Sequence, residues 1–349
     1  MVGEISKIDR SPLLPDRHPQ GDLFVCDIFD AVPKGDSASM EHPVFSLSTK
    51  PDLREREYSN GGAWLKVTPS TKGMATVHDR DILIYCISQL MAGKKQGRTP
   101  AKTLSLKAYD LLTATNRQTN GQAYDGLKAS LERLRGTTIS TNVTTAGIEQ
   151  FDIFGLIEKA TVKRATRDGR MQDVEITLSD WLVNAVNGDE VLTLNRRYFQ
   201  LRKPLERRLY DLARKHCGQQ PAWQIGLEKL RVKTGSNSTP KEFKRLLGKI
   251  IEDDLGHEHM PDYSFRLEGG IVTVTPKPEF TEAYAPSPAP QLSLFLKPET
   301  YAKAREAAPS WDIHYLENEW RAWVTEPPRN SDAAFIGFCR KWFEKRGRA

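Results

Sequence analysis

Basic side chains recur at helical spacing between residues 240 and 250, in the stretch PKEFKRLLGKI. Lys241, Arg245 and Lys249 are predicted to project from one side of a helix, whereas an apolar stripe that includes Phe243 and Leu247 lies on the other. Lysine and arginine neutralise phosphate groups and donate hydrogen bonds to base edges. The pattern therefore indicates binding of a polyanion. The alternative is an ordinary helix whose basic face is only solvated.

The residues before this helix are of the types that a tight turn between two helices requires. Gly235 permits a left-handed backbone, Ser238 or Thr239 can cap the following helix, and Pro240 suits its first position. We therefore predict that residues 223–252 form two short helices joined by a turn, which is a helix-turn-helix.

A strand pattern follows the helix-turn-helix. The segment YSFRLE begins at Tyr263, contains Arg266 and alternates in polarity, and the β-branched segment IVTVT comes after a Gly269-Gly270 turn. Two helices followed by a β-hairpin is the order of a winged helix, in which the second helix enters the major groove and the hairpin lies beside it.

The same pattern occurs a second time, displaced by a constant 119 residues. In order, the matched residues are Leu104, Leu106, Leu111, Thr115, Tyr124, Leu127 and Leu131 in the first copy and Trp223, Ile225, Leu230, Thr234, Phe243, Leu246 and Ile250 in the second. The match has no gap and spans the turn, so we interpret the chain as two copies of one domain.

Positive charge is concentrated in the second copy. Residues 201–250 contain 13 Lys or Arg and 4 Asp or Glu, a net charge of +9, whereas the whole chain is only +6. The corresponding face of the first copy carries Asp125, which phosphates would repel, so we assign DNA reading mainly to the second copy. The predicted DNA-binding residues are Ser238, Thr239, Lys241, Lys244, Arg245, Lys249, Arg202, Lys203, Arg207 and Arg266.

The composition is typical of a soluble globular protein. Of 349 residues, 38% are hydrophobic and 28% charged, and no apolar run approaches the roughly 18 residues of a membrane span. The four cysteines are scattered, without a CxxC pair, so we expect reduced thiols in a cytoplasm, with no disulfide and no metal site. No Gly-rich loop followed by Lys-Ser or Lys-Thr is present, so we expect neither a nucleotide cofactor nor catalysis.

Composition divides the chain into five parts. We predict a flexible arm at 1–40 with an apolar island at Leu23–Phe29, a first domain at 41–188, a second at 189–278, a Pro-rich linker at 279–309 and a helical segment at 310–349. Predicted strands are 44–47, 63–67, 137–144, 151–163 and 173–178, and predicted helices are 81–92, 204–217, 311–324 and 332–345. In the last segment Trp320, Trp323, Phe335, Phe338 and Trp342 are expected to form a small core.

Long strings in this chain resemble the plasmid replication initiator protein A family. They include DILIYCISQL, YDLLTATNRQTNG, LKASLERLRGTTISTN, LSDWLVNAV and EVLTLNRRYFQLRKPLERRLYDLARKHCG, and the resemblance covers roughly residues 41–280. It implies an α+β protein of two tandem winged-helix domains that binds repeated origin sequences, called iterons, to start plasmid replication. In such initiators the first winged helix commonly mediates dimerisation, the dimer represses its own gene and the monomer opens the origin. Host initiator and replicative helicase are further partners that the resemblance suggests.

The Pro-rich linker contains a second resemblance. Gln291, Leu292, Leu294 and Phe295 form the pentapeptide QLSLF, which looks like the motif by which bacterial proteins bind the β sliding clamp of the replicase. An extended peptide with a Gln anchor and three apolar side chains can fill a hydrophobic groove. The alternative is that these apolar residues fold back on the body of the protein.

The sequence is also compatible with two other functions. A plain transcriptional repressor would use the same winged helices. A rolling-circle nickase uses a His-hydrophobe-His metal pair with a nucleophilic Tyr, but the only tight His pair, His257-Glu258-His259, has an acidic centre and is expected in a solvated loop, with Tyr263 in a strand.

Overall fold

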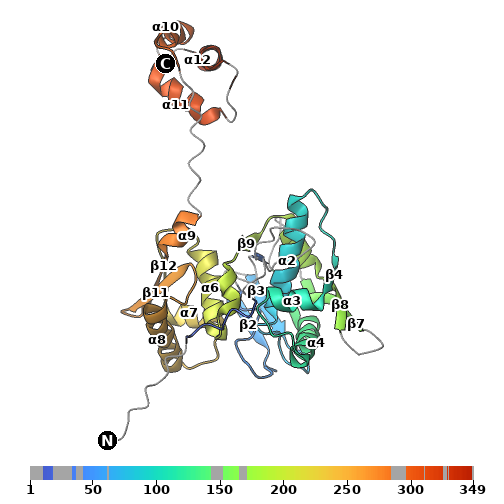
Figure 1. The fold of residues 1–349 in the computed structure, drawn as a ribbon. Helices are drawn as coiled ribbons and strands as arrows, with labels where there is room; N and C mark the ends of the chain where they lie inside the picture. The colour runs from blue at the N-terminus through green and yellow to red at the C-terminus, as the bar shows by residue number, and fades with distance from the viewer. Residues whose placement is uncertain are drawn as a thin grey trace, which may run out of the picture. The chain divides into compact units, whose positions relative to one another are not determined.

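The computed structural model describes residues 11–18, 34–36, 42–60, 63–142, 152–164, 171–283, 296–309, 311–324, 328 and 330–347. The chain divides into two compact units, residues 1–281 and 282–349 (Figure 1). The fold is mixed α+β. No helix in the described ranges is both long and apolar enough to cross a membrane. The predicted apolar island Leu23–Phe29 lies outside the described residues.

The larger unit contains the predicted repeat. Its first copy runs through α2 (Arg80–Lys95), β4 (Thr103–Lys107), α3 (Ala108–Ala114), α4 (Gly121–Gly136), β7 (Ile157–Arg164) and β8 (Met171–Leu178). Its second copy runs through α6 (Pro204–His216), β10 (Trp223–Gly226), α7 (Leu227–Thr234), α8 (Pro240–His257), β11 (Tyr263–Glu268) and β12 (Ile271–Pro276). The two antiparallel sheets have matching strand orders, β4-β8-β7 and β10-β12-β11.

The first residues of each copy form a strand, which the sequence interpretation did not anticipate. Residues 223–226 were expected to begin a helix, but Trp223 and Ile225 lie in β10, as Leu104 and Leu106 lie in β4. The period of two between these apolar positions is that of a strand. With this strand included, each copy has the order helix, strand, helix, helix, strand, strand, except that β5 and β6 are inserted between α4 and β7 in the first.

A four-stranded sheet accompanies the first copy. It has the order β2-β3-β5-β6 and is formed by β2 (Arg56–Asn60), β3 (Ala63–Thr68), β5 (Thr138–Thr141) and β6 (Asp152–Gly155). The prediction of a strand at 63–67 is confirmed, but that at 44–47 is wrong, since only Ser46 makes an isolated bridge, to Thr76. Val44 and Phe45 are buried there without belonging to a strand.

Short elements join the copies: α5 (Asp180–Asn187), β9 (Val191–Thr193), which pairs with β1 (Lys34–Asp36), and a 3₁₀ turn at Arg196–Gln200. Helix α9 (Pro278–Ala283) follows the second copy. Part of the predicted flexible arm is also attached, because Leu13 bridges Leu201 and the amide of Leu14 donates to the carbonyl of Gln200 at 2.8 Å. Residues 13 and 14 of the predicted arm thus contact the body of the protein.

One hydrophobic core runs through both copies, from Val44 to Phe280. Helix α2 is buried on more than one face, as predicted for residues 81–92. Buried ion pairs join the start of α2 to α6: Arg80 Nη1 lies 2.8 Å from Asp211 Oδ1, and Arg207 Nη1 lies 2.6 Å from Asp81 Oδ1. All four side chains are at most 3% exposed.

The smaller unit has its own core. It consists of α10 (Pro298–Ala307), α11 (Ile313–Trp323) and α12 (Ser331–Arg346). The predicted helices at 311–324 and 332–345 are confirmed, whereas α10 was not expected. Trp320 and Phe335 are buried with ring centroids 5.2 Å apart, and Phe338 and Trp342 pack against this cluster.

Candidate nucleic-acid interface

Helix α8 begins as its sequence predicts. Thr239 is the N-cap, and its hydroxyl accepts a hydrogen bond from the amide of Glu242 at 3.3 Å. Pro240 occupies the first turn, where its missing N–H leaves nothing unsatisfied. Gly235 ends α7 with φ +71°, and a Cβ there would lie 2.8 Å from Pro43 Cβ, so a side chain is excluded on both counts.

The two faces of α8 separate as the spacing requires. Phe243, Leu247 and Ile250 are buried against the body of the protein. The four predicted cationic residues all lie on the exposed face: Lys241, Lys244, Arg245 and Lys249. The sequence therefore folds into an amphipathic helix whose solvent side is basic.

Two of these cations have acidic neighbours on the same helix. The guanidinium of Arg245 donates to both carboxylate oxygens of Glu242, at 2.8 and 2.7 Å, and Lys249 Nζ lies 2.9 Å from Asp253 Oδ1. Arg245 is 64% exposed and Lys249 is 57% exposed. Exposed pairs of this kind are weak, so a phosphate can displace them.

A groove of about 580 Å³ adjoins α8. It brings together four predicted residues, Lys203, Ser238, Arg245 and Lys249. Lys203 Nζ donates to Asp253 Oδ2 at 2.8 Å, so Lys203 and Lys249 share one carboxylate. The groove is thus rich in cationic and hydroxyl groups that suit a phosphodiester backbone.

The groove also contains a residue that the sequence interpretation missed. Arg54 lines it from the segment before β2, with its Nε 3.0 Å from Asp52 Oδ1 and its side chain 65% exposed. Next to it, Arg56 Nη1 donates to the carbonyl of Gly235 at 3.0 Å, across 179 residues of sequence. Burial alone would raise the pKa of Asp52, but the bonds from Arg54 and Arg56 hold that pKa well below its ordinary value. The only sequence signal was a charged stretch, LREREY, whose partner is remote.

Arg207 requires a correction. It was predicted to contact DNA, but it is 2% exposed, and its guanidinium binds Asp81 and the carbonyls of Leu201 and Phe199 at 2.6, 2.9 and 3.1 Å. Every face of this guanidinium is engaged inside the protein, so no phosphate can reach it. Arg202, which belongs to the same run of basic residues, is exposed, and its Nη2 lies 3.5 Å from the carbonyl oxygen of Leu13.

Arg266 lies on the β11–β12 hairpin. Its side chain is 76% exposed, and its nearest acidic group among the described residues, Glu268, is 3.7 Å away. Strand β11 packs on α8 (Figure 1), so Arg266 extends from the element next to the basic helix.

The histidine pair is not a solvated loop, which corrects the expectation for His259. His259 is fully buried, with Nε2 3.1 Å from Glu206 Oε1, whereas His257 is exposed at the end of α8. Within the described ranges, no three His, Cys, Asp or Glu residues are arranged to hold a metal ion. The predicted clamp motif, Gln291 to Phe295, lies outside the described residues.

Comparison with known proteins identifies the class. The family model described as Replication initiator protein A matches residues 34–265. A protein of Wigglesworthia glossinidia brevipalpis described as "Putative replication protein" is 36% identical over 232 residues, which are 65% of this chain and 82% of that protein. The chain therefore belongs to the Replication initiator protein A family, as its sequence strings indicated.

Solved structures with a similar outline include two of RctB domains 2 and 3. One, of selenomethionine derivatives, has a TM-score of 0.49 at 16% identity and covers 68% of this chain and 96% of its own. The other has a TM-score of 0.48 at 16% identity and covers 71% of this chain and 99% of its own.

Proposed function

We propose that this replication initiator binds iterons of a plasmid origin through two tandem winged-helix domains, residues 41–188 and 189–278. The shared order of helix, strand, helix, helix and two-stranded hairpin supports the winged-helix assignment. The observation that carries the proposal is the exposed basic face of α8, which follows a tight turn and is flanked by a hairpin. In this arrangement α8 enters the major groove, and Arg202, Lys203 and Arg266 contact phosphates.

The two copies have different roles in this proposal. The outward face of α4 exposes Gln122 and Asp125 where that of α8 exposes Lys241 and Lys244. An exposed carboxylate repels phosphates, so α4 is a poorer reader of DNA than α8. We assign iteron reading to the second domain, and homodimerisation with auxiliary DNA contact to the first.

DNA binding by a Lys241→Ala, Arg245→Ala double variant tests the main proposal. Origin fragments and a scrambled duplex are titrated with wild type and variant across a salt series. We expect repeat-specific wild-type binding that the variant loses by on the order of 100-fold, with a shallower salt dependence. The charge-matched control is Lys95→Ala, Lys303→Ala, because both lysines are exposed and lie outside α8. Equal wild-type affinity for origin and scrambled DNA would refute the proposal.

The linker motif supports a second interaction in the proposal. QLSLF offers the Gln anchor and apolar side chains that a clamp groove accepts, and Ala-Pro repeats precede it. A Leu294→Ala, Phe295→Ala variant should lose binding to purified β sliding clamp while retaining DNA affinity. If the variant still binds the clamp as wild type does, the motif is not the contact.

We further propose that the protein acts without catalysis in the cytoplasm, recruits the host initiator and replicative helicase, and represses its own gene. The separation of the two histidines supports the absence of a nickase site, since His259 is buried against Glu206 while His257 is exposed at the end of α8. Wild type should melt supercoiled origin DNA, seen by permanganate reactivity, without nicking it in Mg²⁺ or Mn²⁺. A transcriptional repressor would bind without melting, and nicking would show an enzyme.

A further inference from the structure

A second cavity, of about 510 Å³, is lined in part by α4 of the first copy, and it shares Ser48 with the groove beside α8. Five separate segments build its wall: the N-terminal piece at Arg17, the loop at 48–51, the stretch 72–79, the turn at 117–118 and α4. Five of its lining residues are cationic and one is acidic: Arg17, Lys50, Lys72, Arg117 and Arg133, against Asp79. This excess of positive over negative side chains in a concave site favours binding of an anion.

The acidic group of the cavity is already neutralised. Arg133 donates to both oxygens of Asp79, each at 2.7 Å. Burial alone would raise the pKa of Asp79, but these bonds and the charge of Arg133 outweigh it and lower that pKa. His78 adds no charge near neutrality, because burial, then the nearby Arg207 charge, lowers its pKa to about 4. The net charge therefore comes from the other cations.

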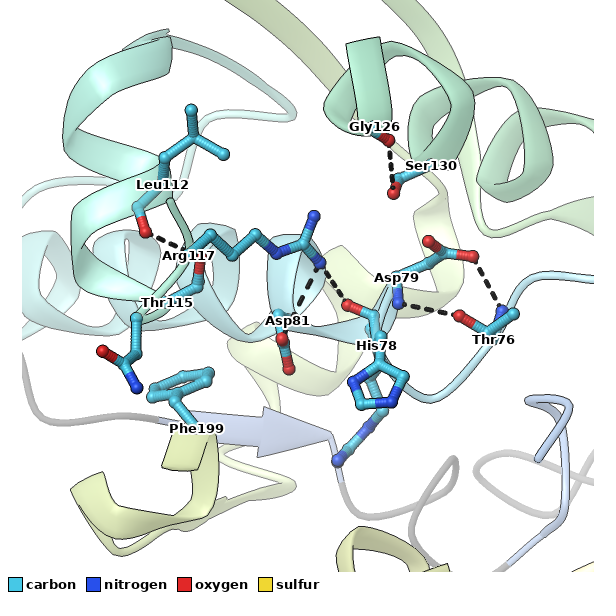
Figure 2. Close-up of polar contacts among 12 residues, drawn as sticks. Thr76, His78, Asp79, Asp81, Leu112, Thr115, Arg117, Gly126, Ser130 and Phe199 are labelled. Atoms are coloured by element: carbon cyan, nitrogen blue, oxygen red, sulfur yellow. Dashed lines mark hydrogen bonds and ion pairs between the residues drawn. The ribbon is translucent and has the colours of Figure 1, made fainter. Parts of the chain in front are cut away.

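Arg117 is fixed at the back of the cavity. Its Nη2 donates to the carbonyl of His78 and lies 3.7 Å from Asp81 Oδ2, while its own amide donates to the carbonyl of Leu112 at 2.8 Å (Figure 2). Its side chain is 20% exposed. The Asp81 carboxylate is shared with Arg207, so it does not cancel the Arg117 charge completely.

The N-terminal segment supplies a cation to the cavity. The amide of Arg17 donates to Asn116 Oδ1 at 2.9 Å, its Nη1 donates to the carbonyl of Asn116 at 2.8 Å, and His18 Nε2 lies 2.9 Å from the carbonyl of Arg117. Asn116 has φ +55°, which directs its backbone into this contact. In the described part of the chain, Arg17 Nε and Nη2 have no hydrogen-bond partner, so they are available to a ligand.

Helix α4 and two lysines complete the site. Asn120 caps α4, whose first turn contributes Gln122 and Ala123 to the wall, so the positive end of the helix dipole faces the cavity. Lys50 and Lys72 are exposed and form no ion pair among the described residues. We propose that this cavity binds a phosphate group and that the N-terminal segment at Arg17 is part of the site.

The phosphate has two possible sources, the DNA backbone or a free phosphate compound. The first source depends on the DNA-binding function proposed above, and the second does not. Two measurements on the full chain separate them, one with inorganic pyrophosphate by calorimetry and one with duplex DNA in a salt series. One variant combines Lys50→Ala with Lys72→Ala, and a second carries Arg17→Ala alone. The control is again the double variant Lys95→Ala, Lys303→Ala.

We expect the lysine variant and Arg17→Ala each to weaken pyrophosphate binding by at least about tenfold relative to the control. If the ligand is the DNA backbone, the slope of log affinity against log salt also becomes shallower, by about 0.9 for each phosphate that the variant no longer neutralises. Weaker pyrophosphate binding with an unchanged DNA slope assigns the site to a free phosphate compound. The proposal is overturned if neither measurement changes, and Arg17 is excluded from the site if only the lysine variant has an effect. If the wild-type protein binds pyrophosphate but not DNA, the proposed function is refuted but this phosphate site is not.

Discussion

At the residue scale, the least expected feature is the set of charges buried between the copies. Arg80, Asp81, Arg207 and Asp211 are nearly inaccessible and form two ion pairs between α2 and α6. Arg80 Nη1 also lies 3.2 Å from the hydroxyl of Tyr198, and the Arg207 guanidinium lies over the Tyr198 ring at 5.1 Å. Such pairs have little net effect on stability while intact, but they are costly to break. They lie where the two copies meet, so their role there can be tested.

Replacing Arg207 by Met tests that role. The change leaves Asp81 in the interior with only the more distant Arg117, 3.7 Å away, so the free energy of unfolding should fall by about 3 to 5 kcal/mol. Urea denaturation followed by circular dichroism measures this. Arg202→Met is the matched control, since Arg202 is exposed and adjacent to the same helix. A Met variant as stable as its control would mean that the buried pair is dispensable.

His78 should give the protein an acid-sensitive stability. Its pKa is lowered from 6.5 to about 4 by burial and by the Arg207 charge, so below pH 6.5 the unfolded chain binds a proton that the folded protein does not. Stability is therefore complete above pH 6.5 and declines as the pH falls to about 4, by about 3 kcal/mol in total. Asp79, whose pKa is lowered from 3.8, titrates below this window.

The measurement is the urea midpoint of wild type and His78→Gln between pH 7 and 4. The variant should lose less stability over this range, because Gln takes up no proton. His257→Gln is the control, since His257 is exposed in the same unit. Parallel curves for wild type and His78→Gln would exclude His78 as the cause.

At the element scale, α8 depends on local signals that the sequence states directly. Thr239 and Pro240 define its start, and Gly235 ends the helix before it. These signals act within a few residues, which is why the turn and the basic face were predictable. The strand at Trp223 was missed because a four-residue apolar pattern cannot distinguish strand from helix before its partner, β12, is known.

Remote partners account for the other differences. Strand β2, REYSN, has no apolar pattern and exists because it pairs with β3. Arg207 appeared to belong to a surface cluster because its partner Asp81 is 126 residues away. The sequence interpretation missed Arg54 for the same reason, because the groove that it lines is formed largely by residues remote in sequence. Local sequence thus predicted the repeat, helix α8 and its exposed cations, but not which arginines the interior uses.

Removing the N-cap of α8 should lower the stability of the protein more than removing an exposed side chain of the same helix. Thr239→Ala deletes the oxygen that accepts the Glu242 amide, so the unfolding free energy should fall by about 1 kcal/mol, while Thr239→Ser should retain most of it. Lys244→Ala is the control, because it changes an exposed side chain on the same helix without touching the cap. Equal urea midpoints for the Ala and Ser variants would show that the cap contributes nothing.

At the scale of the whole molecule, the continuous core and the buried ion pairs predict that both copies unfold together, while residues 282–349, with their own core, unfold separately. A chain ending at residue 283 should therefore keep the urea midpoint of the larger unit. That chain retains three tryptophans, Trp64 and Trp181 in or beside the first copy and Trp223 in the second. Each copy can thus be given its own fluorescence reporter.

In the shortened chain, Trp223→Phe leaves reporters only in the first copy, and Trp64→Phe, Trp181→Phe leaves one only in the second. A cooperative unit gives the same urea midpoint from both reporters, within about 0.2 M, once each variant is compared with its own circular dichroism curve. Adding Arg207→Met should lower both midpoints and, if the ion pairs are what couples the copies, separate them. If the two reporters give different urea midpoints while Arg207 is still present, the copies are independent domains. The spacing between α4 and α8 would then be adjustable rather than fixed by the protein.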